Sequence, residues 1–334
     1  MPRVTIVVAT RNEPKPLSAC LEALRRQTVP CEVIVADGGN DTATQRLARE
    51  TGVHRIENPE RIAATGWNAG IRASTSEVVG IMSSHAAPAP DYVERCLAAL
   101  RATNAWAVGG RIARRGSSGP TQEAVARATS SPFGVGDARH NYSDRAHWVE
   151  TAFPGMWPRW VLERVGMFDP ELVRNQDDEL SVRIRQAGGR IWYDPAIVVE
   201  YEPRDSLRGV FQQYRQYGYW KVRVYGKHRS AVRPRQLVPA AWLSALAIGA
   251  VGLLTGTSLR WLLLPAGAGY GAFAGLAAAR LGGRSLGPRV AAVLVAIHLG
   301  YGLGMWQGAV AAVRRRLLSL RSGRDGSTVD PRHR

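Results

Sequence analysis

The sequence predicts an α/β domain with a Rossmann-like, mostly parallel sheet, followed by an amphipathic interfacial helix and by C-terminal transmembrane helices. From residue 3 onward, short β-branched runs alternate with helical stretches, which is typical of consecutive βαβ units. The excess positive charge is confined to the last third of the 334-residue chain. That same third contains three long apolar runs without an acidic, lysine or arginine side chain.

The first third of the chain supplies the elements of the predicted sheet. Strands are expected where β-branched residues are continuous, over residues 4–9, 31–36, 53–57, 77–82 and 106–110. Helices are expected between them, over residues 14–27, 42–51, 65–74 and 91–101. Ligands of such sheets bind at the carboxyl ends of the strands. The loops of interest are therefore Thr10–Glu13, Asp37–Asp41 and Ser83–His85.

Charge divides the chain into four segments. Residues 1–203 contain 24 basic and 24 acidic side chains, so the predicted α/β domain is neutral. Residues 204–235 contain nine basic and one acidic side chain, and we expect a basic interfacial segment there. Residues 236–313 contain four basic and no acidic side chains and hold about three transmembrane helices, and residues 314–334 form a basic tail. Because the net charge of +17 is interleaved with apolar runs, it predicts membrane lipids as partners and no nucleic acid.

The three apolar runs cover Leu237–Gly256, Trp261–Ala279 and Val290–Val313. Each has roughly the 20 residues that a helix needs to cross a bilayer, and each is apolar all round, unlike a helix of a soluble bundle. Three crossings would place Arg314–Arg316 on the outer side, against the positive-inside tendency. Either one run is re-entrant, or one lies flat, or the tail breaks the rule, and the sequence leaves these alternatives open.

The N-terminus is expected in the cytosol. The first apolar run, Val4–Ala9, is too short for the core of a signal peptide. Three widely spaced cysteines predict neither a disulfide framework nor a CxxC metal site, which agrees with a reducing compartment. We therefore expect a multi-pass protein of the cell membrane, with its α/β domain on the cytosolic face.

Two of the predicted loops carry carboxylates suited to a nucleotide. Glu13 could accept a hydrogen bond from a ribose or a base, although it would look the same in a solvated loop. Asp37 could accept from a nucleobase N–H group, while the glycines that follow let the backbone approach a ligand. The same stretch also fits a turn with a helix N-cap at Asp41 or Thr42, and both interpretations can hold together.

Six stretches carry a family resemblance through their order and spacing: Val35–Thr44 (VADGGNDTAT), Ala128–Ala138 (ATSSPFGVGDA), Phe153–Gly155 (FPG), Val165–Pro170 (VGMFDP), Arg174–Leu180 (RNQDDEL) and Gln216–Val222 (QYGYWKV). From Val4 to about His228 the chain resembles the inverting glycosyltransferases of family 2, most closely their membrane-attached branch typified by succinoglycan-biosynthesis glucosyltransferases. The resemblance implies a GT-A fold and a UDP-sugar donor. It also implies donor contacts from Thr10, Glu13, Asp37, Asn68, Ser83 and His85.

The catalytic base implied by the resemblance lies in Arg174–Leu180. Inverting transfer needs a group that takes the proton of the acceptor hydroxyl as it attacks the anomeric carbon. Asp177 occupies the position of the Asp in the family's Glu-Asp pair, with Gln176 at the Glu position and Asp178 beside it. Neighbouring carboxylates raise one another's proton affinity, which suits a base. Acidic residues are also common in the first turn of any helix, so a structural role is the alternative.

The metal motif departs from the family pattern. The family usually has Asp-x-Asp or Asp-Ala-His where this chain has Ser83-Ser84-His85, so the first Asp is replaced by Ser83. His85 stands at the metal-contacting position, and an imidazole suits Mn²⁺ better than Mg²⁺. A divalent cation, Mn²⁺ or Mg²⁺, would be held by His85 and phosphates alone, or with help from Glu200 or Glu202, or metal dependence has been lost.

The acceptor side is expected around two segments. Within Asp205–Ser230, aromatic and aliphatic residues at helical spacing alternate with basic ones, as in helices that lie in the membrane interface. In the family this region borders the acceptor site, which implies acceptor contacts from Pro154, Gly155, Gln213, Tyr217 and Trp220. A plain surface anchor is the alternative.

Together these features predict a membrane-anchored, inverting glycosyltransferase of bacterial polysaccharide biosynthesis. It would transfer a sugar, with glucose as the first candidate, from a UDP-sugar to a polyprenyl-diphosphate-linked glycan. One alternative is a transferase that loads the sugar directly onto polyprenyl phosphate. Another is a non-catalytic membrane scaffold that kept the fold after its metal motif degenerated.

Overall fold

The computed structural model describes residues 3–114, 119–136, 138–151 and 153–322. The chain divides into two compact units: residues 1–209 with 274–294, and residues 210–273 with 295–334. The first boundary falls close to the predicted end of the α/β domain. Residues 323–334 of the predicted basic tail, and residue 137 of the Ala128–Ala138 stretch, lie outside the described residues.

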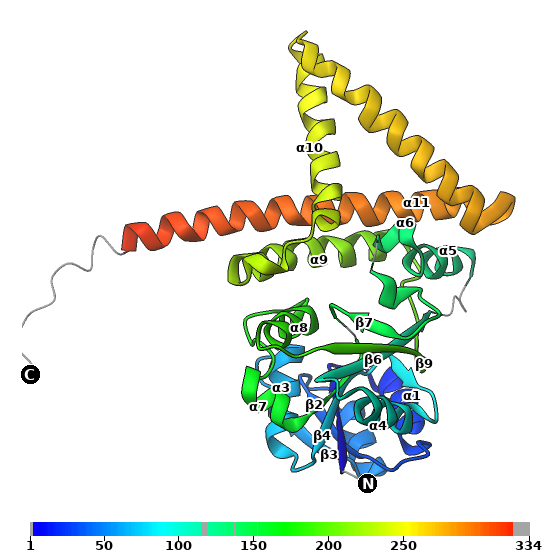
Figure 1. Cartoon of the computed structure of the whole chain (residues 1–334), viewed down its shortest axis with the longest axis vertical. Coiled ribbons are helices and arrows are strands. Elements are labelled where there is room, and N and C mark those ends of the chain that lie inside the picture. The colour runs from blue at the N-terminus through cyan, green and yellow to red at the C-terminus, as the bar shows by residue number, and fades with distance from the viewer. Residues whose placement is uncertain (1–2, 115–118, 137, 152, 323–334) are drawn as a thin grey trace, which may run out of the picture. The chain divides into compact units, whose positions relative to one another are not determined.

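The first unit is built on a mixed sheet, which among the described residues contains nine strands (Figure 1). Its first half is parallel, as predicted, with the strand order β3-β2-β1-β4. These strands are β1 (Val4–Thr10), β2 (Glu32–Asp37), β3 (His54–Glu57) and β4 (Val78–Ser83). The connecting helices are α1 (Pro14–Arg25), α2 (Thr42–Thr51) and α3 (Ala63–Ala73). The predicted βαβ units are therefore confirmed.

The second half of the sheet is not mostly parallel. Strand β8 (Gly155–Pro158) is antiparallel to both β4 and β6 (Ala107–Arg114), between which it lies. Strand β9 (Ile191–Tyr201) is parallel to β6, and it pairs antiparallel with β5 (Ala86–Pro88) and β7 (His147–Val149). This half contains short strands that are remote in sequence, so the βαβ pattern does not extend into it.

Among its described residues, the first unit also contains α4 (Tyr92–Thr103), α5 (Pro120–Thr129), α6 (Pro132–Val135), α7 (Arg159–Val165) and α8 (Gln176–Gln186), together with residues 274–294 of a long C-terminal helix. A 3-10 turn covers Arg139–Asn141. The bounds of α4 agree with those of the predicted helix, residues 91–101, within two residues. Helix α8 begins at Gln176, so Asp177 lies in its first turn.

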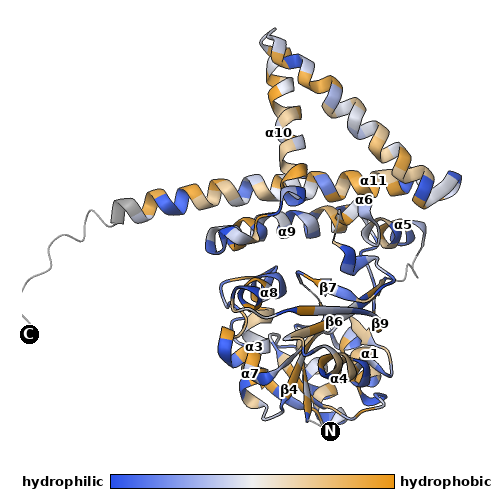
Figure 2. Cartoon of the chain, in the orientation of Figure 1, coloured by the Kyte–Doolittle hydropathy of each residue, from blue (hydrophilic) through white to orange (hydrophobic). Residues whose placement is uncertain are grey.

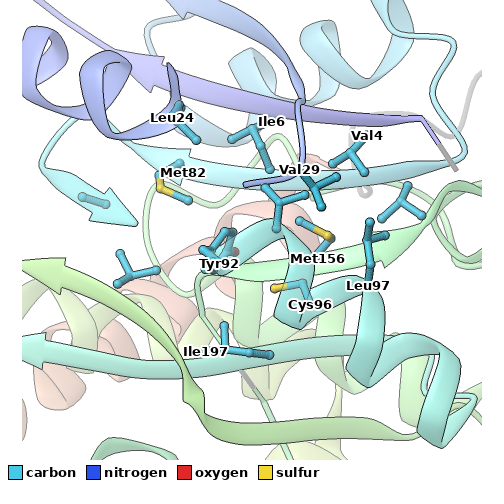
Figure 3. Packing of buried hydrophobic residues seen from close by; sticks show 14 of the residues in the cluster. Val4, Ile6, Leu24, Val29, Met82, Tyr92, Cys96, Leu97, Met156 and Ile197 are labelled. Carbon is cyan, nitrogen blue, oxygen red and sulfur yellow. The ribbon is translucent and has the colours of Figure 1, made fainter. Parts of the chain in front are cut away.

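Hydrophobic side chains cover both faces of the sheet. On β1, Ile6 and Val8 belong to one buried cluster, which includes Tyr92, and Val7 belongs to another, which includes Trp67. Figure 3 shows part of the first cluster. A strand buried on both faces reads as a continuous apolar run, which explains why β1 was visible in the sequence.

Beyond residue 206 the described chain is helical, and most of these residues, 210–273 and 295–322, belong to the second unit. Helix α9 covers Leu207–Lys227, α10 covers Pro234–Leu254, a 3-10 helix η3 covers Ser258–Leu262, and α11 covers Leu263–Ser322. In Figure 2, α10 is mainly apolar whereas α9 carries many hydrophilic residues. The first predicted span falls in α10, and the second and third share α11, where Gly283 breaks the helical backbone. By length and composition, two helices of the described residues are candidate membrane spans.

Candidate active site

The carboxyl ends of β1, β2 and β4 lie side by side at one edge of the sheet. In the strand register, Thr10 is opposite Asp37 and Ala9 is opposite Ser83. The backbone N–H of Gly38 also donates to the carbonyl oxygen of Thr10 at 2.9 Å. The three loops predicted from the sequence are therefore brought together.

Asn12 joins the loops that follow β1 and β2. Its side-chain oxygen accepts hydrogen bonds from the backbone N–H groups of Asn40, at 3.1 Å, and Asp41, at 3.2 Å. A Cβ atom at Gly39 would overlap the Asn12 side chain, so this close approach requires glycine. Asp41 in turn caps α2 by accepting from two backbone N–H groups of its first turn, which confirms the predicted N-cap.

Asp37 is buried at the end of β2. One carboxylate oxygen accepts the Gly39 N–H at 2.9 Å, and the other lies 3.0 Å from Nε of Arg55, which reaches it from β3. The ion pair compensates the burial of the charge. Beside it, the hydroxyl of Thr10 is buried and has no hydrogen-bond partner among the described residues. An unsatisfied buried hydroxyl at the binding edge of the sheet is a group that a ligand can use.

Glu13 connects the loop after β1 with the loop after β4. Its carboxylate accepts a hydrogen bond from the Ser84 hydroxyl at 2.7 Å and lies 2.9 Å from Nε2 of His85. The hydrogen bond from His85 holds the pKa of the Glu13 carboxyl below its ordinary value, against the opposing effect of partial burial. The Ser84 hydrogen bond and the charge of Arg204 lower this pKa further. Glu13 is therefore a carboxylate held at a junction of loops. Within the loop after β4, the Ser83 hydroxyl accepts a hydrogen bond from the backbone N–H of His85 at 3.3 Å.

A polar pocket of about 240 Å³ opens beside His85. Its walls come from the segment that follows β9 and from α5, and it is lined by His85, Gln122, Tyr201, Glu202, Pro203, Arg204 and Asp205. The Gln122 amide donates to the carbonyl oxygen of Pro203 at 2.9 Å, which fixes this segment against α5. The pocket thus places an imidazole, carboxylates and one guanidinium around a space that opens to solvent.

The described part of the chain does not by itself assemble a metal cage. Within the described residues, no group of three or more His, Cys, Asp or Glu side chains is arranged to hold an ion. Glu200 lies inside β9 rather than after it, whereas Glu202 lines the same pocket as His85. One imidazole and one carboxylate on a polar pocket fit a divalent cation only if a ligand such as a diphosphate completes the coordination.

Asn68 has a structural partner. It is buried in α3, its amide nitrogen donates to the carbonyl oxygen of Phe168 at 2.7 Å, and its amide oxygen accepts the Phe168 N–H at 2.9 Å. These two bonds tie α3 to the segment between α7 and α8. A donor contact from Asn68 stays a prediction, and both polar atoms of its amide are engaged in this bridge.

The first turn of α8 carries the predicted base. Asp177 and Asp178 are half-buried there, after Asn175, whose φ of 62° turns the chain into the helix. Glu179 points elsewhere: it is buried and accepts two hydrogen bonds of 2.8 Å from Arg183. Of the three consecutive carboxylates in this turn, Glu179 is therefore the one that forms an ion pair with Arg183. Carboxylates in a first turn are also stabilised by the helix dipole. A structural role of Asp177 and Asp178 at the start of α8 is therefore the alternative to catalysis.

Arg183 anchors α8 to the rest of the first unit. Besides Glu179, it donates to the backbone carbonyl oxygens of Val165, Gly166 and Met167 at 2.6 to 2.8 Å. These bonds hold the C-terminal end of α7 against α8. The amide nitrogen of Gln176, at the start of α8, is buried without a hydrogen-bond partner among the described residues.

The predicted acceptor residues are distributed over the two units. Pro154 and Gly155 are buried at the start of β8, where Phe153–Pro154 is a cis peptide bond. On α9 of the second unit, the Gln213 amide donates to the Tyr217 hydroxyl at 3.0 Å. The Arg223 guanidinium lies over the ring of Trp220, 5.5 Å from its centroid. Their acceptor contacts stay predictions.

Four residues of this site were not singled out from the sequence: Asn12, Arg55, Ser84 and Arg204. Asn12 and Ser84 lie inside the predicted loops, so their position was a usable signal. Arg55 belongs to a strand and Arg204 to a basic stretch, and nothing in their local sequence separates them from other arginines.

Comparison with known proteins agrees with this geometry. Residues 5–167 match the family model of glycosyl transferase family 2. The chain is 29% identical to the succinoglycan biosynthesis protein ExoA of Rhizobium meliloti (strain 1021) over 327 residues, which cover 93% of this chain and 96% of that protein.

A second relative is the dolichyl N-acetyl-alpha-D-glucosaminyl phosphate 3-beta-D-2,3-diacetamido-2,3-dideoxy-beta-D-glucuronosyltransferase of Methanococcus voltae, 24% identical over 64% of this chain and 71% of its own length. Among solved structures, the mannosyltransferase PcManGT of Pyrobaculum calidifontis, in complex with GDP-Man and Mn²⁺, is similar with a TM-score of 0.57 and 22% identity. The match covers 90% of this chain and 87% of that one. At this identity the similarity supports the GT-A-like fold.

Proposed function

Because this chain carries a family 2 glycosyltransferase domain, we propose that it transfers a sugar from a UDP-sugar to a polyprenyl-diphosphate-linked glycan, with inversion at the anomeric carbon. Glucose is the first candidate for the sugar. The observation that carries the proposal is the junction of three loops at the carboxyl edge of the sheet, where Glu13 holds Ser84 and His85 beside a polar pocket. The similarity to ExoA, a succinoglycan biosynthesis protein, supports a role in polysaccharide synthesis, and the similarity to the Methanococcus voltae transferase, which is named for a dolichyl-linked sugar phosphate, supports a lipid-linked acceptor.

The nucleotide would bind across the loops that follow β1 and β2. The unsatisfied Thr10 hydroxyl supplies a hydrogen-bonding group, and the Asp37 carboxylate is held in place by Arg55. Glycines after Asp37 allow the backbone to approach the base closely. The diphosphate would then point to the pocket beside His85, where Arg204 supplies a positive charge.

Transfer would proceed in one displacement. Asp177 takes the proton of the acceptor hydroxyl while its oxygen forms a bond to the anomeric carbon. The bond from that carbon to the diphosphate oxygen breaks on the opposite face, its electron pair leaves with UDP, and no covalent enzyme intermediate forms. Placement of Asp177 and Asp178 at the start of α8, anchored through Arg183, supports a fixed position for the base.

The departing diphosphate needs positive charge or hydrogen-bond donors. Arg204 and backbone N–H groups of the loops would supply part of this stabilisation. When bound, a divalent cation would neutralise the diphosphate, and His85 with Glu202 would hold it, Mn²⁺ being favoured by the imidazole.

The test is release of UDP by the detergent-purified full-length protein. UDP-glucose, other UDP-sugars and GDP-mannose are supplied with a lipid-linked acceptor, in Mn²⁺, Mg²⁺ or chelator. Asp177→Asn is expected to reduce turnover by at least ~100-fold, since general-base catalysis typically contributes that much. Glu163→Gln is the matched control, because Glu163 is an exposed carboxylate on α7, and it should retain wild-type turnover.

The alternatives are distinguished by the same assay. If polyprenyl phosphate is labelled instead of the lipid-linked glycan, polyprenyl phosphate is the acceptor and the first alternative is correct. Absence of turnover with every donor and ion, together with intact glycan synthesis in cells that carry Asp177→Asn, would support the non-catalytic scaffold.

A further inference from the structure

A glycine-mediated helix pair dominates the second unit. At three positions of α11, a Cβ atom would overlap a backbone carbonyl oxygen of α9, and these contacts pair Gly300 with Phe211, Gly304 with Arg215 and Gly308 with Tyr219. A Cβ atom at Gly218 of α9 would likewise overlap the carbonyl oxygen of Tyr301. Both helices advance by four residues from one contact to the next, so they run parallel and in backbone contact over more than two turns.

Helix α9 is too charged to cross a bilayer. It carries five basic side chains and no acidic one: Arg208, Arg215, Lys221, Arg223 and Lys227. A cation at the bilayer centre is strongly unfavourable, so such residues are rare in membrane-spanning helices. The amphipathic and basic character of α9 instead fits the interface with anionic lipid. Because residues 300–308 of α11 are parallel to α9 and in contact with it, they follow the same direction.

The third apolar run, Val290–Val313, is covered by other helices of the chain, which can explain its apolar character without contact to lipid. Its glycine face packs on α9, and on another face Gly302 packs against the backbone of Pro239 in α10, while the Trp306 indole N–H donates to the Ser244 hydroxyl at 3.2 Å. Ile297 and Met305 are buried as well. A helix covered by protein on several faces reads as uniformly hydrophobic, as a membrane span does.

Helix α10 and the residues that follow it have the opposite character. Leu254 is 86% exposed, and Val238, Val251 and Leu264 are also exposed. The chain turns back at η3, and the Trp242 ring stacks on the Tyr270 ring with a centroid distance of 4.3 Å. With 21 residues, α10 spans about 31 Å, which matches the hydrocarbon core of a bilayer.

We propose that the chain crosses the membrane twice, through a hairpin of α10 and the first part of α11, and that residues 295–313 lie on the cytosolic surface of the membrane together with α9. The partner of this surface is anionic phospholipid. Exposed side chains of Val310, Val313 and Leu317 would enter the acyl region, while the exposed cations of α9, Arg208, Arg215 and Lys227, contact headgroups. Two crossings return the chain to its starting side.

This topology removes the conflict with the positive-inside tendency. Arg314–Arg316 and the arginines at positions 280, 284 and 289 lie on the same side as α9. The turn on the opposite side is short, and Arg260 is its only basic residue. The proposal does not depend on which sugar is transferred.

Single cysteines labelled with a membrane-impermeant maleimide test the proposal in the full chain. Ser18→Cys reports the side of α1 in the first unit, Ser258→Cys the turn at η3, and Ser319→Cys the end of α11, and all three serines are exposed. We expect Ser319→Cys and Ser18→Cys to be labelled in inside-out vesicles and protected in right-side-out vesicles. Ser258→Cys should show the reverse, and Thr257→Cys repeats this measurement at the neighbouring position.

The native cysteines leave a low background. Thiolates are the reactive form, and burial raises the pKa of Cys20 to about 12 and that of Cys31 to about 11. The wild-type chain is the blank, and each variant is first shown to resist carbonate extraction. Labelling of Ser319→Cys from the same side as Ser258→Cys would mean a third crossing and would overturn the proposal. Labelling of Ser258→Cys and Thr257→Cys from the side of Ser18→Cys would show that the hairpin does not cross, and would overturn it equally.

Discussion

At the scale of single residues, Glu13 determines how the candidate donor site is assembled. It lies after β1, yet both of its partners lie after β4. Both hydrogen bonds lower the pKa of the Glu13 carboxyl, and the one from His85 has the larger effect. His85, for which the family resemblance implies a metal contact, is thus held by Glu13, a carboxylate that the sequence indicated only as a nucleotide contact.

Glu13→Gln tests this orienting role. The amide can still accept from Ser84, but it loses the charge that pairs with His85. We expect turnover to fall by ~10-fold or more, since a displaced catalytic group reduces rate steeply, with a stability change below ~1 kcal/mol because the pair is partly exposed. Steady-state kinetics and thermal unfolding measure the two effects. Glu22→Gln, which removes an exposed ion pair with Arg25 on α1, is the control and should change neither.

The contribution of Glu13 to stability also has a predicted pH dependence. Its folded-state pKa lies below the ordinary value of 4.5, so the stabilisation is fully present above pH 4.5 and is lost as the pH falls through the lowered folded-state pKa. The difference in unfolding free energy between wild type and Glu13→Gln should therefore be constant from neutral pH down to about 4.5 and shrink below it. A difference that disappears already between pH 7 and 5 would contradict the assignment.

At the scale of elements, glycines have opposite meanings in the two parts of α11. Gly304 faces the Arg215 carbonyl oxygen on α9, whereas a Cβ atom at Gly267 would meet nothing within 4 Å. In a helix interior, glycine is less favourable than alanine by roughly 1 kcal/mol. At position 304 glycine is therefore required by the close contact with α9, whereas at position 267 no neighbouring atom requires it.

Alanine at these two positions should shift stability in opposite directions. Gly304→Ala is expected to lower the unfolding temperature, because its methyl group would push α9 and α11 apart. Gly267→Ala should leave the temperature unchanged or raise it slightly, through helix propensity. Thermal unfolding of both full-length variants in the same detergent gives the comparison. Equal shifts for the two variants would argue against close packing of α9 on α11.

At the scale of the whole molecule, the uneven distribution of charge predicts two kinds of membrane attachment. We expect the exposed basic residues of α9 to attract anionic headgroups, and salt would weaken that attraction. The apolar surface of α10 would attach through hydrocarbon burial, which salt does not weaken.

Membrane washing separates these contributions. The full-length protein should stay in the membrane pellet after high-salt and alkaline carbonate washes, because an inserted hairpin is not released by screening charge. Immunoblotting of pellet and supernatant measures this. Release by salt alone would mean that none of the apolar runs crosses the membrane.

Much of the first unit could be predicted from its sequence, because the relevant signals are local. The apolar run of β1 and the Gly52 that ends α2 are visible within a few residues. So are the positions of Thr10 and Asp37 at the ends of strands, and of Glu13 in the loop that follows the first of them. In contrast, β5, β7 and β8 have three or four residues each, and the place of β8 between β4 and β6 depends on pairing with strands remote in sequence.

The sequence by itself determined the βαβ order, the loops that carry the site and the presence of an apolar, basic C-terminal third, since each follows from periodicity or composition. Only the tertiary structure decided which groups meet: Asp37 with Arg55, Glu13 with His85, and Asn68 with Phe168. The third apolar run shows the physical reason most clearly. A helix surrounded by lipid and a helix packed between other helices have the same hydrophobic pattern. Tertiary contacts, such as those of Gly300, Gly304 and Gly308 with the backbone of α9, are not visible in that pattern.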